Sequence, residues 1–155
     1  GLTVAIVGDI MHSRVARSNV YGLKKMGANV VLVAPKTLLP PGVETWGAHI
    51  STEFDPVIPE ADAIMMLRVQ KERLNERFFS GEREYSVFYG LNKRRVDMMK
   101  DGAVIMHPGP MNRGVEITHD AADCARSIIL DQVENGVAIR MTLLYLSMGG
   151  TANVD

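Results

Sequence analysis

Two arginines occupy positions in the sequence where a cation is unusual. Arg14 follows Ser13, a residue typical of a helix N-cap, so Arg14 would lie in the first turn of a helix. That turn carries partial positive charge and unpaired N–H groups, and a cation is tolerated there when an anion shares the site. The pattern therefore indicates an anion-binding position, and the alternative is an Arg14 side chain that turns out to solvent.

Arg68 is the second unusual cation, because it follows the apolar run 63–67 of a segment that we expect to be a buried strand. Arginine is almost never fully buried without a partner. Arg68 either binds an anionic ligand or pairs with Glu72 or Asp9, and an acidic partner would also hold the guanidinium toward a carboxylate. Gln70 lies two residues on, on the same face of a continuing strand, where it would add an amide group unless it faces solvent from a loop.

A rigid turn, His107-Pro108-Gly109-Pro110, follows a further apolar run. Its two prolines fix the backbone and lack N–H donors. The carbonyl groups of Pro108, Gly109 and Pro110 are therefore predicted to accept hydrogen bonds from an amide or amine of a ligand. The alternative is that the prolines simply end the strand.

The elements that position these residues alternate short apolar runs with helical patterns, as βαβ units do around a parallel sheet. We expect strands at 2–7, 29–34, 48–51, 62–69 and 103–106, and helices at 14–26, from Asn92 to about 101, and at 127–148 with a weak point at Asn135-Gly136. The fold class is α/β and Rossmann-like, a parallel sheet of about five strands flanked by helices. With the strand order three-two-one-four-five, Arg14 and Arg68 would face each other across the crevice where the order reverses.

Composition excludes several classes of protein. The chain has 155 residues and a net charge of −1, which predicts one domain over 1–155 and, without a basic excess, no nucleic-acid partner. No apolar run reaches membrane-spanning length, so no membrane association is expected. Cys124 is the only cysteine, which suits a reducing compartment such as the cytoplasm and favours a packing role over a nucleophile. No metal-ligand spacing occurs, and Gly8 stands alone where a dinucleotide-binding turn has three glycines, so we expect no metal and no cofactor.

The sequence also predicts the behaviour of two further segments. The charged segment 71–84 is too polar for the core and is expected to act as a lid over the site. The segment 137–148 is apolar on more than one side, so as a helix it would need two neighbours, of which this domain would supply one. The chain also begins inside a predicted strand, as a chain cut at a domain boundary would.

Three motifs follow one another in the chain: Gly8-Asp9 with Ser13-Arg14-Val15, Arg68-Val69-Gln70-Lys71-Glu72-Arg73, and the turn His107-Pro108-Gly109-Pro110 with Met111-Asn112-Arg113-Gly114-Val115-Glu116. In combination they resemble the C-terminal, aspartate-binding domain of the aspartate carbamoyltransferases, over nearly the whole chain. The ornithine relatives carry a His-Cys-Leu-Pro turn instead. The resemblance implies transfer of a carbamoyl group from carbamoyl phosphate to aspartate, a step of pyrimidine biosynthesis.

The resemblance also implies roles for single residues. Arg14 and Arg68 would hold the aspartate carboxylates with help from Gln70, and the backbone at 108–110 would contact the carbamoyl group of carbamoyl phosphate. Val15 stands where some relatives have Thr, so only a backbone contact is expected there. The family's N-terminal domain, with its phosphate cradle and most trimer contacts, is not in this sequence. No catalytic set is complete in this chain, which alone should be inactive, whereas the intact enzyme would be a homotrimer.

Two other interpretations stay open at the level of sequence. The chain could be a stand-alone, non-catalytic module that binds a small dicarboxylate. It could also be a Rossmann-like nucleotide domain, which the poor glycine pattern disfavours.

Overall fold

A parallel sheet forms the centre of the computed structural model, which describes residues 1–69 and 81–151. Its five strands lie in the order β3-β2-β1-β4-β5. They are β1 (Thr3–Val7), β2 (Asn29–Val33), β3 (His49–Ser51), β4 (Ala63–Met66) and β5 (Val104–Met106). The α/β class and the strand order that the sequence predicts are both confirmed.

The register aligns the ends of the strands that carry the motifs. Val7 of β1 lies level with Val33 of β2 on one side and with Met66 of β4 on the other. All of these residues are buried, as expected for a sheet with both faces covered. The chain therefore leaves β1 and β4 at the same edge of the sheet, where the strand order reverses.

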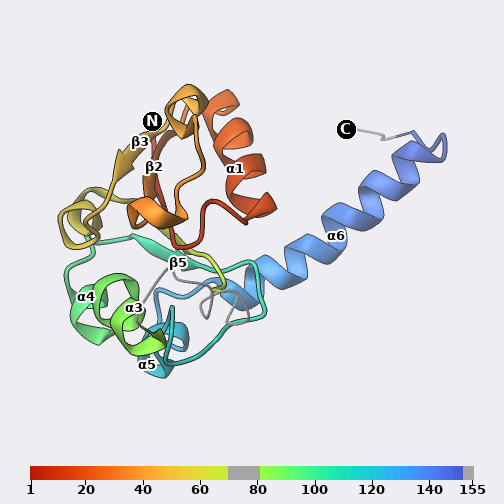
Figure 1. Cartoon of the computed structure of the whole chain (residues 1–155). Helices are drawn as coiled ribbons and strands as arrows, with labels where there is room; N and C mark the ends of the chain where they lie inside the picture. Colours follow the sequence, from red (N-terminus) through yellow and green to blue (C-terminus); the bar gives the residue numbers. More distant parts are fainter. Residues whose placement is uncertain (70–80, 152–155) are drawn as a thin grey trace.

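Helices flank the sheet (Figure 1). Helix α1 (Arg14–Lys25) packs near β2, while the short helices α3 (Glu82–Tyr89), α4 (Lys93–Asp97) and α5 (His119–Ala122) gather beyond β5. Three 3₁₀ turns, η1 (Lys36–Leu38), η2 (Val43–Trp46) and η3 (Asp55–Glu60), connect the strands. Ser13 caps α1 as predicted, because its Oγ accepts the N–H of Ala16 at 3.0 Å.

Several elements differ from the predicted bounds. Strand β4 ends at Met66 rather than at residue 69, and the helix after Asn92 ends at Asp97 rather than near 101. Helix α3 was not predicted; it takes residues 82–84 of the expected lid, whereas 71–80 lie outside the described residues. The predicted weak point at Asn135-Gly136 is wrong, since α6 (Ile129–Ser147) runs through it without a break.

Helix α6 leaves the body of the molecule as a long rod (Figure 1). Ile129 at its start is its only buried residue, and large apolar side chains from Leu130 to Leu146 are exposed. The expectation that the rest of the domain covers one side of this helix is wrong, because both sides are bare. Over the residues that the structure describes, no helix has both the length and the apolar character needed to cross a membrane.

Candidate functional site

The loops that follow β1, β4 and β5 meet around one cavity of about 260 Å³. A pocket near the lower end of the range known for ligand sites suits a small metabolite. Its lining comes from three parts of the chain far apart in sequence: Asp9, His12, Ser13, Arg14 and Val15; Leu67 and Arg68; Pro108, Gly109 and Pro110. The structure thus brings together five of the six residues predicted from the sequence, and Gln70 lies outside the described residues.

Two arginine side chains line this cavity and remain exposed to solvent. Arg14 begins α1 and Arg68 lies two residues beyond the end of β4, and both side chains are exposed. The expectation that Arg68 sits inside a buried strand is wrong, because β4 is shorter than its apolar run suggests. The two exposed arginines favour an anionic ligand, and at Arg14 the unpaired N–H groups of the first turn of α1 add to the positive charge.

The carboxylate of Asp9 bonds to His12 rather than to Arg68. The Nδ1 of His12 lies 2.9 Å from Oδ1 and 3.0 Å from Oδ2 of Asp9, and the N–H of His12 donates to Oδ1 at 3.1 Å. Between residues 1–69 and 81–151, Arg68 forms no ion pair, and Glu72, the other expected partner, lies outside these ranges. An ion pair with Asp9 therefore does not explain why an arginine occupies position 68.

A buried histidine supports the turn after β5. Gly109, in a left-handed conformation with φ 65°, donates its N–H to Nδ1 of His107 at 2.9 Å. Since Nδ1 accepts this bond, the ring proton is on Nε2, which lies 3.2 Å from Oε1 of Glu116. Both His107 and Glu116 are fully buried. The exposed Gly109 and Pro110 are thus supported from the interior by the side chains of His107 and Glu116.

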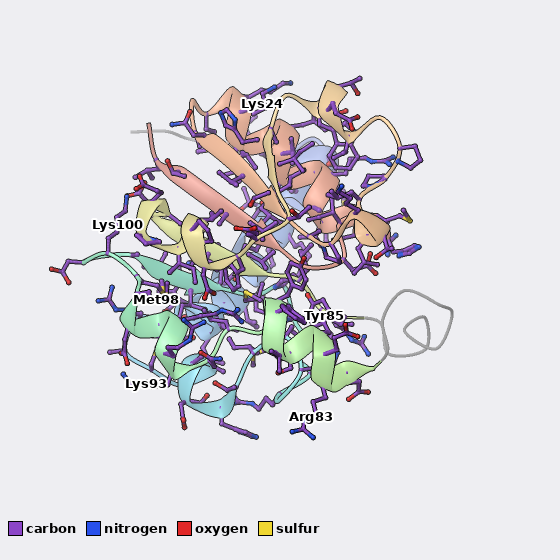
Figure 2. The ribbon with its side chains drawn as sticks, turned by 60° about the vertical axis from the view of Figure 1, so that its left-hand side comes forward. Lys24, Arg83, Tyr85, Lys93, Met98 and Lys100 are labelled. Atoms are coloured by element: carbon purple, nitrogen blue, oxygen red, sulfur yellow. The ribbon has the colours of Figure 1, made fainter. Side chains whose placement is uncertain are left out.

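One more side chain, Asn112, connects the loops, and Tyr85 lies close to the loop after β1. Asn112 donates its N–H to Oε1 of Glu116 and its Nδ2–H to the carbonyl of Val69, the latter at 2.7 Å. Tyr85 reaches from α3 into the body, whereas Arg83 on the same helix points outward (Figure 2). Burial, together with the nearby charges of Glu116 and Asp9, raises the pKa of Tyr85, so the phenol stays neutral. These contacts depend on folding and left no signal in the sequence pattern.

The geometry can bind a small ligand with two anionic groups. Two arginines supply fork-shaped donors that match carboxylates, and the proline-rich turn supplies carbonyl acceptors for an amine or amide. In the described part of the chain, no group of three or more His, Cys, Asp or Glu residues is placed to hold a metal ion.

Residues 1–147 match the Asp/Orn-binding domain of the aspartate/ornithine carbamoyltransferases. The chain belongs to this family. It is 58% identical over 151 residues to the aspartate carbamoyltransferase catalytic subunit of a Nocardioides species, covering 97% of this chain and 47% of that protein. It is 54% identical over 155 residues to the catalytic subunit of Desulforapulum autotrophicum, covering 100% and 50%. The chain therefore spans about half the length of the relatives that it matches.

Solved structures of the family share the fold. An aspartate transcarbamoylase from Trypanosoma cruzi, in complex with carbamoyl aspartate and phosphate, has a TM-score of 0.78 at 25% identity and covers 94% of this chain and 49% of its own. The ornithine carbamoyltransferase from Pyrococcus furiosus has a TM-score of 0.76 at 29% identity, covering 98% and 51%. Both branches of the family thus have this architecture, and the fold alone does not separate the aspartate from the ornithine enzymes.

Proposed function

We propose that this chain is the aspartate-binding domain of an aspartate carbamoyltransferase, which transfers the carbamoyl group of carbamoyl phosphate to the amine of aspartate in de novo pyrimidine biosynthesis. The observation that carries the proposal is the convergence of Arg14, Arg68 and the turn 108–110 on one cavity. Identity of 54–58% to aspartate carbamoyltransferase catalytic subunits supports aspartate over ornithine as the substrate. Two exposed guanidinium groups also suit the two carboxylates of aspartate, whereas ornithine has one.

In the proposed reaction, the amine of aspartate attacks the carbonyl carbon of carbamoyl phosphate. A C–N bond forms, the C–O bond to phosphate breaks, and phosphate leaves with the bonding electrons while the amine loses a proton. Arg14 and Arg68 hold the aspartate carboxylates, with Gln70 assisting, and the backbone of Pro108, Gly109 and Pro110 contacts the carbamoyl group. No covalent enzyme intermediate is needed, so the rate depends on orientation and charge stabilisation.

The proposal places the rest of the active site outside this chain. The relatives are about twice as long, and an N-terminal domain would supply the groups that bind the phosphate. We further propose that the intact enzyme is a cytoplasmic homotrimer. Because the two reactants would be held by different domains, this chain alone should bind ligand weakly and give almost no turnover.

The test compares two purified proteins: the chain of 155 residues and the chain joined to the N-terminal half of its relatives. We expect the joined protein to form carbamoyl aspartate from carbamoyl phosphate and aspartate at roughly 1–1000 per second, and to leave ornithine unchanged. The chain alone should give no product above the uncatalysed rate. Turnover in that range by the chain alone would disprove the half-site proposal. Aspartate binding without turnover in the joined protein would favour the alternative, a non-catalytic dicarboxylate-binding module.

A further inference from the structure

A continuous hydrogen-bonded path joins the loop after β4 to the loop after β5. We propose that Asn112 is a positioning residue that fixes Arg68 relative to the turn 108–110. This inference rests on the proposed function, because it concerns how the aspartate site keeps its shape. The residue lies beside the cavity and is not among those that line it.

The first part of the path is the side chain of Asn112. Its Nδ2–H donates to the carbonyl of Val69 at 2.7 Å, and Val69 directly follows Arg68 in the chain. The last ladder bond before this loop is from the N–H of Leu67 to the carbonyl of Val7, at 2.8 Å. In the described residues after Leu67, the hydrogen bond from the Asn112 amide connects this loop to the rest of the fold. Val69 is 1% exposed, so water cannot readily reach its carbonyl to replace the Asn112 donor when that donor is removed.

The second part of the path runs from Asn112 to the turn. Its backbone N–H donates to Oε1 of Glu116, which also receives the Nε2–H of His107 at 3.2 Å. The Nδ1 of His107 in turn accepts the N–H of Gly109 at 2.9 Å. His107 and Glu116 are both 0% exposed, and hydrogen bonds in such a low-dielectric interior reinforce one another.

The path explains how two loops from different strands keep a fixed separation. Loops after parallel strands are anchored mainly by the strands themselves, and the exposed side chain of Arg68 has no partner of its own in the described structure. A clamp for two carboxylates must hold its arginines to within a fraction of an ångström. Loss of the Val69–Asn112 bond leaves the Gly109–His107–Glu116 part intact, so it should release Arg68 and leave the turn in place.

The expected kinetic effect follows from this separation. If the loop with Arg68 is in its binding position only about a tenth of the time, the affinity for aspartate falls by the same factor, while the fully bound complex reacts normally. In the full-length enzyme, Asn112→Ala should raise KM for aspartate about tenfold and change kcat at saturating aspartate less than about threefold. KM for carbamoyl phosphate should change less than about twofold, because the turn stays in place.

Asn112→Leu provides a second variant, which retains the approximate size of the side chain and removes its amide group. Asn29→Ala is the matched control, since Asn29 is exposed at the start of β2, at the opposite end of the sheet. The control should leave both KM values unchanged. Hydrogen exchange in the full-length protein gives a readout that does not depend on turnover, and residues 66–69 should exchange faster in both Asn112 variants than in the control.

The two proposals fail in different ways. A wild-type full-length protein that forms no carbamoyl aspartate overturns the proposed function. A wild-type enzyme with normal activity, together with an unchanged KM for aspartate in the two Asn112 variants, overturns the positioning role alone. Unchanged exchange at 66–69 also overturns it, as does a fall in melting temperature without any change in KM, which is the behaviour of a residue that serves only the fold.

Discussion

Arg68 is the residue whose surroundings separate a binding role from a structural one. An arginine that served the fold would be buried against a carboxylate, whereas Arg68 is exposed and its expected partner Asp9 bonds His12 at 2.9 Å. Arg14 faces the same cavity. Two like charges at one cavity repel each other until an anion enters, so the fold gains little from Arg68 in the absence of ligand.

Replacing Arg68 by Ala in the full-length enzyme tests this role. We expect the affinity for aspartate to fall by about tenfold or more, because a charge-assisted contact is worth about 1.5–3 kcal/mol. The melting temperature should change little, since substitutions at exposed positions usually cost within about 0.5 kcal/mol. KM for carbamoyl phosphate should stay near the wild-type value.

The control is Arg83→Ala, which removes an exposed arginine side chain from α3. Arg83 points away from the body (Figure 2) and does not line the cavity. Its aspartate dependence should match the wild type. An Arg68→Ala enzyme that melts much earlier yet responds normally to aspartate would show that Arg68 serves the fold.

Residue type and position relative to strand ends were enough to predict that five of the named residues meet at one cavity. Arginines and a proline-rich turn placed directly after apolar runs led to the cavity that the structure contains. The support beneath it could not be predicted, because His107 and Glu116 are separated by nine residues and Asn112 and Val69 by 43. Such pairs show no regular spacing in the sequence, and their donors and acceptors come within hydrogen-bonding distance only in the folded chain.

At the scale of elements, Arg95 joins α4 to η3 and to the end of α3. This side chain is 4% exposed; its Nε donates to Asp55 at 2.6 Å, and its NH groups donate to the carbonyls of Gly90 (2.6 Å) and Phe88 (2.9 Å). Its guanidinium also stacks over the ring of Phe54 at 5.1 Å. One buried cation thus satisfies acceptors from several segments.

We expect Arg95→Met to lower the free energy of unfolding by about 2–3 kcal/mol, because two backbone carbonyls lose their donor and the methionine restores only the packing. Arg94→Met is the matched control: Arg94 bonds the other oxygen of Asp55 at 2.6 Å but is 61% exposed. An exposed pair of this kind is worth less than about 1 kcal/mol. Equal losses of stability in the two variants, measured by urea denaturation, would contradict this account.

Asp55 should make part of this stability depend on pH. Partial burial would raise the pKa of Asp55, but hydrogen bonds from Arg94 and Arg95, and their charges, hold the pKa below its ordinary value. A carboxyl with a depressed folded pKa contributes stability above its unfolded pKa, near 3.9, and loses it as the pH falls through the folded value. The stability gap between wild type and Asp55→Asn should therefore be present at about pH 6 and shrink below about pH 4. A gap that grows on acidification would exclude this origin.

Local signals explain which elements the sequence predicted. Strands β1, β2, β4 and β5 lie in apolar runs, whereas β3 is the short segment His-Ile-Ser. Ser13 and Asn92 cap their helices as expected, with N–H bonds of 3.0 and 3.1 Å. Helix α3 lacks an N-terminal side-chain cap and follows a charged stretch, so its start had no signal. Helix α6 continues through Gly136 because a single glycine costs only about 1 kcal/mol in a helix, which 19 residues can offset.

For the whole molecule, the most consequential feature is the bare helix α6. One stripe of exposed apolar residues runs through Ile139, Leu143 and Leu146, and a second, on the other side, through Met141 and Leu144. Helices that are apolar on both sides are normally buried. The chain spans about half the length of its relatives, and we propose that the other half covers this helix in the full-length protein.

The isolated chain should therefore associate with itself through α6. Contiguous exposed apolar surface of this kind drives association, so light scattering should show oligomers whose population rises with concentration, and a dye that binds apolar surface should fluoresce. Leu143→Glu combined with Leu144→Glu places a charge on each stripe and should return the chain to a monomer. Thr142→Glu is the control, because it adds a charge between the stripes at an exposed polar position and should leave the association in place. A monomer at high concentration, without dye binding, would show that the exposed apolar surface of α6 does not drive association. The double variant would then behave like the wild-type chain.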